Sequence, residues 1–568
     1  MRYPPDICKI PPPKPSALEL HLLKTEFLGK SLSAPFTIPS GIVTCSAPII
    51  QAFFDQIPEV GVLTTKSIGP TPRAGYREPI LSQYSPGNFV NAVGLTNPGA
   101  ERSAELMAEL NIPEDRFLLV SIFGGSVEEY VEVARIMAPH ADGLELNLSC
   151  PHAKGYGMAM GQDPDLVREI TAAVKAAVDV PVVPKLTPNV PNIAEIAKAA
   201  EQGGADAICA INTLGPGSHY SHGAPVLSNG LGGMSGKGVL PIALKCASEI
   251  AEAVSIPVIG CGGISSADNV RSFKGAGASI FGIGSALVGM TTQQIADYFT
   301  TLTADLERGT DNAESLIRYD IDMGFDPVTL VKNEKVSEDI SILTFDKKVG
   351  VQAGEFIFLW IPGLGEKPFS ALIDDPFSLV VINLGEFTDR LIKLEVGTEA
   401  YVRGPHGIPV QPPEGAKIMA VSGGTGLAAV YQIARDLGGE GENKAEIFVG
   451  ARSADRLYFT QECEDISTLH IATDDGSRGH HGLVTEMLRK RLQELSPEQL
   501  DNLYFYNCGP EPMVHAAVAV QKEFCRDEQI HSAIDYMTKC GVGICGACNA
   551  PDGRRLCVDG PFLSGRVD

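Results

Sequence analysis

The sequence lacks any long hydrophobic run and any excess of positive charge. No apolar stretch approaches the roughly 18 residues that a membrane-spanning helix needs, which argues against a membrane partner. The N-terminus is rich in proline and has no apolar signal core, so we expect a protein that is not exported and is cytoplasmic. The formal net charge is −24, whereas binding of nucleic acid or of an anionic membrane requires a basic face. Small molecules are therefore the expected partners.

The sequence also gives no sign of a disulfide framework. Its 13 cysteines are an odd number in a chain that we do not expect to be exported. Four of them crowd between Cys540 and Cys557, and most of the other nine are expected to be buried as small hydrophobic side chains. At 568 residues the chain is too long for one hydrophobic core, so we expect two to four domains.

The first ~300 residues alternate short apolar runs with amphipathic helical patterns. Strands separated by helices pair in parallel through crossovers. Eight such strand candidates in a row predict a (β/α)8 barrel, an α/β fold whose active site lies at the C-terminal ends of the strands. The candidates are "FTIPSGIV", "VGVLTTKSI", "LLVSIFG", "GLELNLSC", "VPVVPKLTP", "DAICAINT", "PVIGCGGI" and "SIFGIGSAL".

Several of these strands end in polar or glycine residues, as an active site at one end of the barrel requires. Lys66 follows the second strand, Asn147 and Cys150 close the fourth, and Lys185 closes the fifth. The sixth to eighth strands contribute Asn212, Thr213, Gly262, Gly263, Gly284 and Ser285. A single polar residue at a strand end commonly just faces a loop, but six strands with the same pattern favour a binding site.

A polar stretch separates this half from a β-rich half. After it, several β-rich runs predict a small antiparallel barrel, and a strand, glycine turn and helix begin a small α/β domain. The predicted segments are an N-terminal arm (1–21), the (β/α)8 barrel (22–305), a linker (306–324), an antiparallel β-barrel (325–413), an α/β nucleotide-binding domain (414–530) and a cysteine segment (531–568).

The cysteine segment has the spacing C-x4-C-x2-C-x8-C, formed by Cys540, Cys545, Cys548 and Cys557. The first three match the ligand spacing of plant-type [2Fe-2S] clusters, and the intervening glycines let backbone amides point at the sulfurs. Zinc sites usually show two separated C-x2-C pairs, and this segment has one. The spacing therefore predicts a [2Fe-2S] cluster over structural zinc or disulfides.

Three motifs predict nucleotide sites in the second half. "VSGGTGLAAV" follows an apolar run, as a pyrophosphate cradle at a helix N-terminus does, although glycine turns of this kind are common. "NCGPEPMV" is placed at a strand end facing that turn, and "KPFS" offers a flavin site. The NAD candidates are Gly423, Gly424, Thr425, Gly426, Cys508, Gly509 and Pro510, and the FAD candidates are Lys367, Pro368, Phe369, Ser370 and Thr388. Over roughly residues 325–520 the motifs resemble the ferredoxin-reductase family, in which a flavin barrel precedes a nicotinamide domain.

Cys150 admits three interpretations: a packed core residue, a metal ligand or a catalyst. Burial is the commonest fate of a cysteine. This one closes a barrel strand and precedes a glycine-bearing loop, "HAKGYGMAMGQ", and no metal-ligating residue is nearby at a suitable spacing. A base on a lid over a bound flavin therefore fits better.

With these motifs in hand, the first domain resembles the class 1 dihydroorotate dehydrogenases over about residues 22–305. The second half resembles the electron-transfer subunit of the NAD-linked branch of that family, with its FAD and [2Fe-2S] cluster. The two are usually separate chains, and here they are fused with the catalytic part first. The motifs that carry the first resemblance are "TTKS", "NAVGLTNPG", "NLSCP", "KLTPNV", "INT", "GGMSG" and "GCGGI".

The resemblance implies roles for the barrel residues. Cys150 would exchange a proton at C5 of the pyrimidine while FMN exchanges a hydride at C6. Lys66 and Lys185 would lie beside the flavin, where a cation stabilises the reduced ring. The implied substrate-binding residues are Lys66, Asn91, Ala92, Val93, Gly94, Leu95, Asn147, His152, Asn212 and Thr213. The implied FMN-binding residues are Ser40, Gly41, Lys66, Ser67, Asn147, Lys185, Ile211, Gly236, Gly262, Gly263, Gly284 and Ser285.

For the second half, the resemblance implies a relay in which FAD trades hydrides with NAD and the cluster passes single electrons between FAD and FMN. It also implies a homodimer formed through the barrels.

Two residues depart from the family pattern. His152 stands where dihydroorotate enzymes commonly have asparagine, and "CPH…GMAMGQDP" also looks like the dihydropyrimidine dehydrogenases. Lys367 stands where the reductase family usually has arginine. A lysine would bind a flavin phosphate as a point charge, without the two parallel N–H donors of a guanidinium. A reductase of another pyrimidine and an electron-carrier module therefore stay as alternatives. The choice between NAD and NADP is open, because Arg452 and Ser453 could meet a 2′-phosphate.

Overall fold

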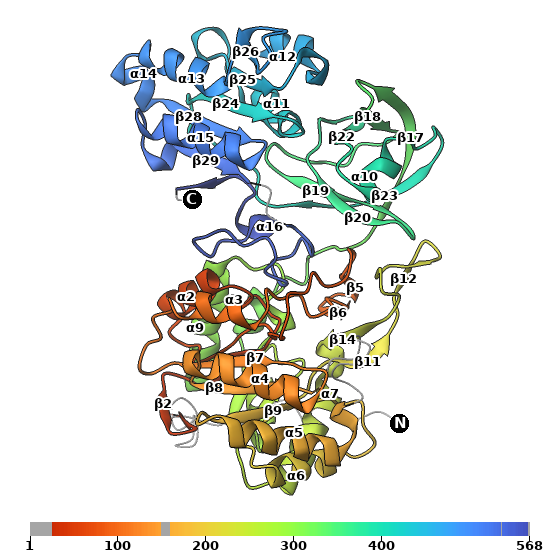
Figure 1. The fold of residues 1–568 in the computed structure, drawn as a ribbon, viewed down its shortest axis with the longest axis vertical. Helices are drawn as coiled ribbons and strands as arrows, with labels where there is room; N and C mark the ends of the chain where they lie inside the picture. The colour runs from red at the N-terminus through yellow and green to blue at the C-terminus, as the bar shows by residue number, and fades with distance from the viewer. Residues whose placement is uncertain (1–24, 149–159, 535–536, 566–568) are drawn as a thin grey trace, which may run out of the picture. The chain divides into compact units, whose positions relative to one another are not determined.

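The computed structural model describes residues 25–148, 160–534 and 537–565 of the chain (Figure 1). They divide into two compact units. The first unit takes its residues from Met1–Tyr76, Gln83–His219 and Leu231–Ile321, and the second from Arg77–Ser82, Tyr220–Gly230 and Asp322–Asp568. Among the described residues, no helix combines the length and hydropathy that a membrane crossing requires.

The first unit is built on a closed barrel of eight parallel strands in the order β10-β15-β16-β3-β4-β7-β8-β9. The predicted (β/α)8 barrel is therefore confirmed. Its strands are β3 (Phe36–Ile38), β4 (Val62–Thr64), β7 (Phe117–Ile122), β8 (Gly143–Asn147), β9 (Val182–Leu186), β10 (Ile208–Ala210), β15 (Val258–Cys261) and β16 (Ile280–Gly282). Its helices are α2 (Ala47–Gln56), α3 (Ala100–Met107), α4 (Val127–Met137), α5 (Pro164–Ala177), α6 (Ile193–Gln202), α7 (Leu240–Ala253), α8 (Ala267–Gly275) and α9 (Thr292–Arg308).

Local sequence signals explain where the barrel helices begin. Asp163, Ser126 and Ser266 each cap a helix by accepting a hydrogen bond from a backbone N–H of its first turn. Thr291 and Gln294 form a reciprocal capping box at the start of α9, and Gly309 ends that helix with a left-handed φ of 69°. Side chains from six of the barrel strands pack together in one buried cluster, which includes Val62, Phe117, Leu119, Val183, Cys209, Cys261 and Ile280.

Smaller sheets accompany the barrel. A hairpin of β1 (Thr25–Phe27) and β2 (Lys30–Leu32) precedes it. A sheet in the order β11-β14-β6-β5 is formed by β5 (Leu81–Ser85), β6 (Asn88–Asn91), β11 (Leu214–Gly217) and β14 (Gly232–Gly236).

The second unit contains two sheets of seven strands each. The first is an antiparallel sheet in the order β20-β19-β23-β17-β18-β22-β21, in the region where the sequence predicted a small antiparallel barrel. It comprises β17 (Asp326–Lys335), β18 (Ile340–Phe345), β19 (Phe356–Ile361), β20 (Gly365–Phe369), β21 (Ile373–Asp374), β22 (Phe377–Ile382) and β23 (Glu399–His406), with helix α10 (Glu386–Leu391).

The second sheet of this unit is parallel except for its last strand, as expected for a nucleotide-binding α/β domain. Its order is β27-β26-β25-β24-β28-β29-β30. The strands are β24 (Lys417–Gly423), β25 (Glu446–Ala451), β26 (Thr468–Thr473), β27 (His480–His481), β28 (Leu503–Cys508), β29 (Ile530–Ala533) and β30 (Leu563–Ser564). The helices are α11 (Gly426–Leu437), α12 (Thr460–Ile466), α13 (Val484–Gln493), α14 (Pro497–Asp501), α15 (Glu511–Lys522) and α16 (Leu556–Asp559).

Two short segments from the first half of the sequence are part of the second unit. They are Arg77–Ser82 and Tyr220–Gly230. The second segment carries the hairpin of β12 (Tyr220–Ser221) and β13 (Ala224–Pro225). Its Val226 lies in a buried cluster with Trp360 and Tyr401. The ring of His222 stacks on Tyr401 at a centroid distance of 4.3 Å. No motif in the sequence indicated this arrangement, and the segment boundaries expected from the sequence remain predictions.

Candidate functional site

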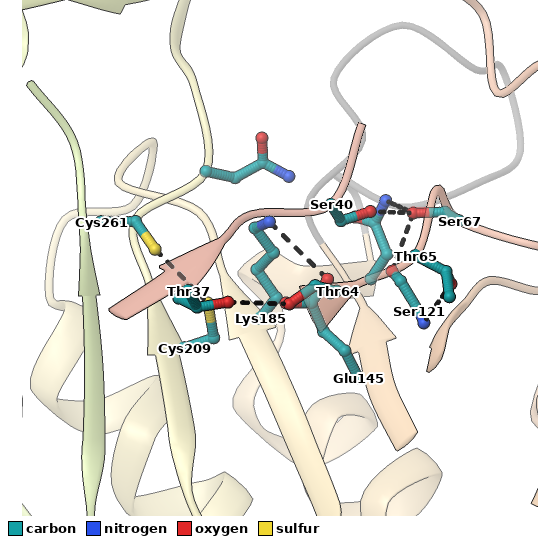
Figure 2. Close-up of polar contacts among 12 residues, drawn as sticks. Thr37, Ser40, Thr64, Thr65, Ser67, Ser121, Glu145, Lys185, Cys209 and Cys261 are labelled. Atoms are coloured by element: carbon teal, nitrogen blue, oxygen red, sulfur yellow. Dashed lines mark hydrogen bonds and ion pairs between the residues drawn. The ribbon is translucent and has the colours of Figure 1, made fainter. Parts of the chain in front are cut away.

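A buried ion pair lies near the C-terminal ends of the barrel strands (Figure 2). Nζ of Lys185 on β9 is 3.6 Å from Oε1 of Glu145 on β8, and both side chains are almost fully buried. Burial opposes the charge of Lys185, but the carboxylate of Glu145 outweighs it and raises the pKa of Lys185 well above its ordinary value. The lysine is therefore an ammonium at neutral pH, as a residue beside a reduced flavin ring would need to be.

Two cysteines lie in the barrel interior close to this pair, as Figure 2 shows. Cys209 on β10 and Cys261 on β15 are buried, with their Sγ atoms 3.9 Å apart. They pack as small apolar side chains in the barrel core, which is the role predicted for most of the scattered cysteines.

A chain of hydroxyl and amide groups joins the ends of several barrel strands (Figure 2). The Nδ2 of Asn147 donates to Oγ of Ser67 at 2.8 Å, and that hydroxyl also lies 3.1 Å from Oγ of Ser40 and 2.9 Å from Oγ of Ser121. The backbone carbonyl of Asn147 accepts from the hydroxyl of Tyr130 at 2.8 Å. The structure thus brings together Ser40, Ser67 and Asn147, three of the residues predicted to bind FMN.

Several predicted glycines lie at close backbone approaches. A Cβ on Gly236, whose φ is 109°, would lie 2.2 Å from the carbonyl oxygen of Gly87. A Cβ on Gly263, whose φ is 77°, would lie 2.9 Å from the carbonyl oxygen of Gly236. A Cβ on Gly262, whose φ is 128°, would lie 2.6 Å from the Cβ of Ala243 and 3.2 Å from Cγ1 of Ile211. These positions require glycine, because each combines a positive φ with atoms where a Cβ would lie.

The remaining predicted barrel residues are placed as follows. Lys66 is half-buried, and its backbone N–H donates to the carbonyl of Thr44 at 2.9 Å. Asn91 ends β6 and donates through Nδ2 to the carbonyl of Gly233 at 3.2 Å. The predicted residues in loops and turns are Gly41, Ala92, Val93, Gly94, Leu95, Asn212, Thr213 and Gly284, whereas Ser285 begins a 3-10 helix (Ser285–Leu287). Cys150 and His152 lie outside the described residues.

In the second unit, the predicted pyrophosphate turn lies against the end of β28. A Cβ on Gly426 would lie only 2.0 Å from the carbonyl oxygen of Cys508, and a Cβ on Gly509 would lie 2.9 Å from the backbone N of Gly423. The two glycine motifs therefore meet, as the sequence predicted. Sequence reasoning missed Tyr458, whose hydroxyl donates to the carbonyl of Gly424 at 2.7 Å, because nothing in its local pattern marks it.

The FAD candidates lie on β20 and α10. Lys367 forms an ion pair with Glu78, with Nζ 3.0 Å from Oε2. Pro368 and Phe369 complete β20, and Ser370 follows it. Thr388 lies on α10, where its Oγ1 accepts from the backbone N–H of Leu384 at 2.8 Å.

The four cysteines of the last segment are all buried. The Sγ atoms of Cys548 and Cys557 are 3.4 Å apart, and the N–H of Gly543 donates to the sulfur of Cys557 at 3.1 Å. Hydrogen bonds from the thiols of Cys545 and Cys557 hold the pKa of Cys540 well below its ordinary value, which favours the thiolate that binds iron. No three His, Cys, Asp or Glu side chains of the described residues are grouped around a site for one metal ion. Four buried cysteines in one short segment fit a two-iron cluster, which takes two thiolates for each iron.

A fully buried arginine supports this segment. Arg403 forms a two-point ion pair with Glu366 at 2.8 and 3.3 Å and donates to the carbonyl of Cys540 at 2.9 Å. Its guanidinium lies 4.3 Å from the ring centroid of Phe358. Burial, together with Arg403, lowers the pKa of His406 to about 3, so its neutral ring accepts from the arginine at 3.3 Å. Sequence reasoning missed Arg403 because it lies in a strand without a motif.

Three parts of the chain match families of known proteins. A model of the family described as dihydroorotate dehydrogenase matches residues 22–302. The dihydroorotate dehydrogenase B (NAD(+)) catalytic subunit of Pyrococcus horikoshii is 44% identical over 271 residues, which is 47% of this chain and 86% of that protein. The subunit of the same name from Methanosarcina acetivorans is 45% identical and covers 49% of this chain and 88% of its own length. The chain belongs to the dihydroorotate dehydrogenase family.

Two further family models match the second half of this family member. One, described as an oxidoreductase NAD-binding domain, covers residues 420–519. The other, described as the iron–sulfur cluster binding domain of dihydroorotate dehydrogenase B, covers residues 535–567. The fusion of catalytic and electron-transfer parts that the sequence predicted is therefore present in one chain, and the chain is an oxidoreductase. Among solved structures, an NADH-dependent reduced ferredoxin–NADP oxidoreductase chain aligns with 42% of this chain and 87% of its own length, at 26% identity and a TM-score of 0.38.

Proposed function

We propose that this chain is an NAD-linked dihydroorotate dehydrogenase of pyrimidine synthesis, which oxidises dihydroorotate to orotate in the barrel. When bound, FMN would take the hydride from C6 of the substrate, and the [2Fe-2S] cluster and FAD would carry the electrons to NAD. One observation carries the proposal. The Lys185 ammonium is fixed by Glu145 at the catalytic end of a barrel that belongs to this family.

Residues of the barrel would remove the substrate proton, bind the substrate and bind the FMN phosphate. Cys150 removes the proton from C5, so that loss of the hydride from C6 leaves the conjugated double bond of orotate. Asn147 presents its amide to the pyrimidine, and because Ser67 accepts from its Nδ2, the orientation of that amide is fixed. The backbone of residues 91–95 holds the substrate carboxylate, and Gly262, Gly263, Gly284 and Ser285 hold the FMN phosphate.

Replacement of Cys150 tests the assignment of the base. In Cys150→Ser, oxidation of dihydroorotate is expected to fall by roughly 10²–10⁴, the usual worth of a positioned acid–base group. FMN should stay bound, and electron flow from NADH to an artificial acceptor should persist, because it needs only the second half. Cys246→Ser, on helix α7, is the matched control and should keep full turnover. Near-normal turnover in a well-folded Cys150→Ser protein would contradict the proposal.

The alternative substrate rests on His152. A neutral imidazole offers one donor and one acceptor in a geometry that differs from that of asparagine. Turnover of dihydroorotate and dihydrouracil by the purified protein distinguishes the two functions. Dominant activity with dihydrouracil would favour a dihydropyrimidine dehydrogenase-like reductase.

The same preparation tests the remaining proposals. We expect one FMN, one FAD and one [2Fe-2S] cluster per chain. Iron and acid-labile sulfide contents near zero after anaerobic purification would contradict the presence of the cluster. We also propose a homodimer, which light scattering would report as twice the chain mass of 60.2 kDa.

A further inference from the structure

Glu78 lies on a short segment of the dehydrogenase half of the sequence that is part of the second unit. Its carboxylate is buried and lies between two lysines. Oε2 is 3.0 Å from Nζ of Lys367, and Oε1 is 3.3 Å from Nζ of Lys539. Its backbone carbonyl also accepts from the N–H of Glu366 at 3.3 Å.

The two lysines belong to the two cofactor segments of the second unit. Lys367 is on β20 and opens the "KPFS" motif predicted for FAD, whereas Lys539 is buried and directly precedes Cys540. Two ammonium groups held against one carboxylate repel each other, so the arrangement depends on the charge of Glu78. The carboxylate thus joins the flavin strand to the cluster segment.

We propose that Glu78 is a positioning residue of the electron-transfer centre, which holds Lys539 beside the cluster ligand Cys540 and balances the positive charge there. The inference rests on the proposed function, because it assumes that the four cysteines hold a [2Fe-2S] cluster. The reduced cluster carries one more electron than the oxidised one, so the charge around it sets its reduction potential. In this way the dehydrogenase half of the sequence contributes directly to electron transfer.

The net charge of Glu78, Lys367 and Lys539, here called the Glu78 triad, predicts the direction in which each variant shifts the reduction potential of the cluster. Two lysines and one glutamate carry a net charge of +1. Glu78→Gln raises that charge by one unit, Lys539→Met lowers it by one, and the double variant restores it. The cluster potential is therefore expected to move to a more positive value in Glu78→Gln, to a more negative value in Lys539→Met, and back close to the starting value in the double variant.

The experiment is a redox titration of the full-length, anaerobically purified protein, with the reduced cluster followed by its paramagnetic resonance signal. Glu334→Gln is the matched control, because Glu334 pairs with Lys332 on β17 of the same unit but is exposed, and its replacement should leave the potential unchanged. If Glu78→Gln does not fold, Lys539→Met and the charge-restoring double variant still test the sign.

The proposal is overturned if both single variants shift the potential in the same direction, or if neither shifts it while the cluster is intact. A loss of signal in a folded Glu78→Gln protein that the folded double variant does not recover also overturns the charge-balancing role. Failure of the proposed function looks different, because the unaltered protein would then contain no iron–sulfur cluster or would not oxidise dihydroorotate.

Discussion

Glu145 and Lys185 are two opposite charges that the barrel buries together. Burying a pair of this kind adds little net stability, because desolvation offsets the attraction, but breaking it leaves an uncompensated buried charge. The desolvation of this ion pair occurs where the Lys185 ammonium is expected to lie beside the flavin ring.

A double-mutant cycle on this pair measures the effect. Glu145→Gln and Lys185→Met are each expected to lower the free energy of unfolding of the barrel by about 3–5 kcal/mol, because each leaves one charge buried alone. The double variant should be markedly more stable than the sum of the two losses predicts. Urea unfolding of the flavin-free protein gives these values without a contribution from bound FMN. Additive losses would show that the two side chains do not interact.

At this scale, the sequence predicted only part of the site. Lys185 and Asn147 could be found because a polar residue at the end of an apolar strand breaks the pattern, whereas Ser67 was expected only from the family resemblance. The hydroxyl of Ser121 and the pairing of Glu145 could not, since both residues lie within strands and their contacts come from neighbouring strands of the closed barrel. The ion pairs of Glu78 with Lys367 and Lys539 could not be predicted either, because the three residues are distant from one another in the sequence.

Among the elements of the second unit, strand β28 and the start of helix α11 approach so closely that only glycine fits between them. A Cβ at position 426 would meet three backbone atoms of Cys508 and Gly509 within 2.7 Å, and backbone cannot move aside as a flexible side chain can. The close approach aligns the glycine turn at the helix N-terminus with the strand end that is predicted to face the nicotinamide.

Gly426→Ala is therefore expected to disturb the NAD site. The first turn of α11 must shift, and the KM for NADH should rise by at least about tenfold, equivalent to roughly 1.4 kcal/mol. Steady-state reduction of an artificial acceptor by NADH measures this, with Gly275→Ala as the control because nothing lies within 4 Å of a Cβ at that position. The rate at which dihydroorotate reduces the FMN of the barrel should be unchanged. An unaltered KM would show that the turn does not hold the nucleotide.

The order of elements was predictable because periodicity changes along the chain, from alternating strands and helices to β-rich runs and back. The hairpin β12–β13 was not, because it is short and polar and its role depends on the surface that it covers. Tertiary contact, rather than local propensity, decides such segments.

For the whole molecule, the two halves of the sequence are not two independent units. Tyr220–Gly230 departs from the dehydrogenase half and supplies part of the core of the second unit. A second unit without it would expose the buried ring of Trp360, together with Phe325 and Tyr401. We therefore expect the second unit to depend on this segment of the dehydrogenase half for its stability.

Trp360 reports on this dependence, because it is the single tryptophan of the chain and is about 1% exposed. Replacing residues 220–230 by a glycine–serine linker of equal length removes Val226 and His222 from its surroundings and lets water reach the indole. The emission of the flavin-free protein should then move to longer wavelength, and acrylamide should quench it more strongly. The same replacement at the exposed residues 413–415 of the second unit is the control and should leave the emission unchanged. If the emission of the first variant also stays unchanged, the segment does not cover this core, and the electron-transfer half is complete without the dehydrogenase sequence.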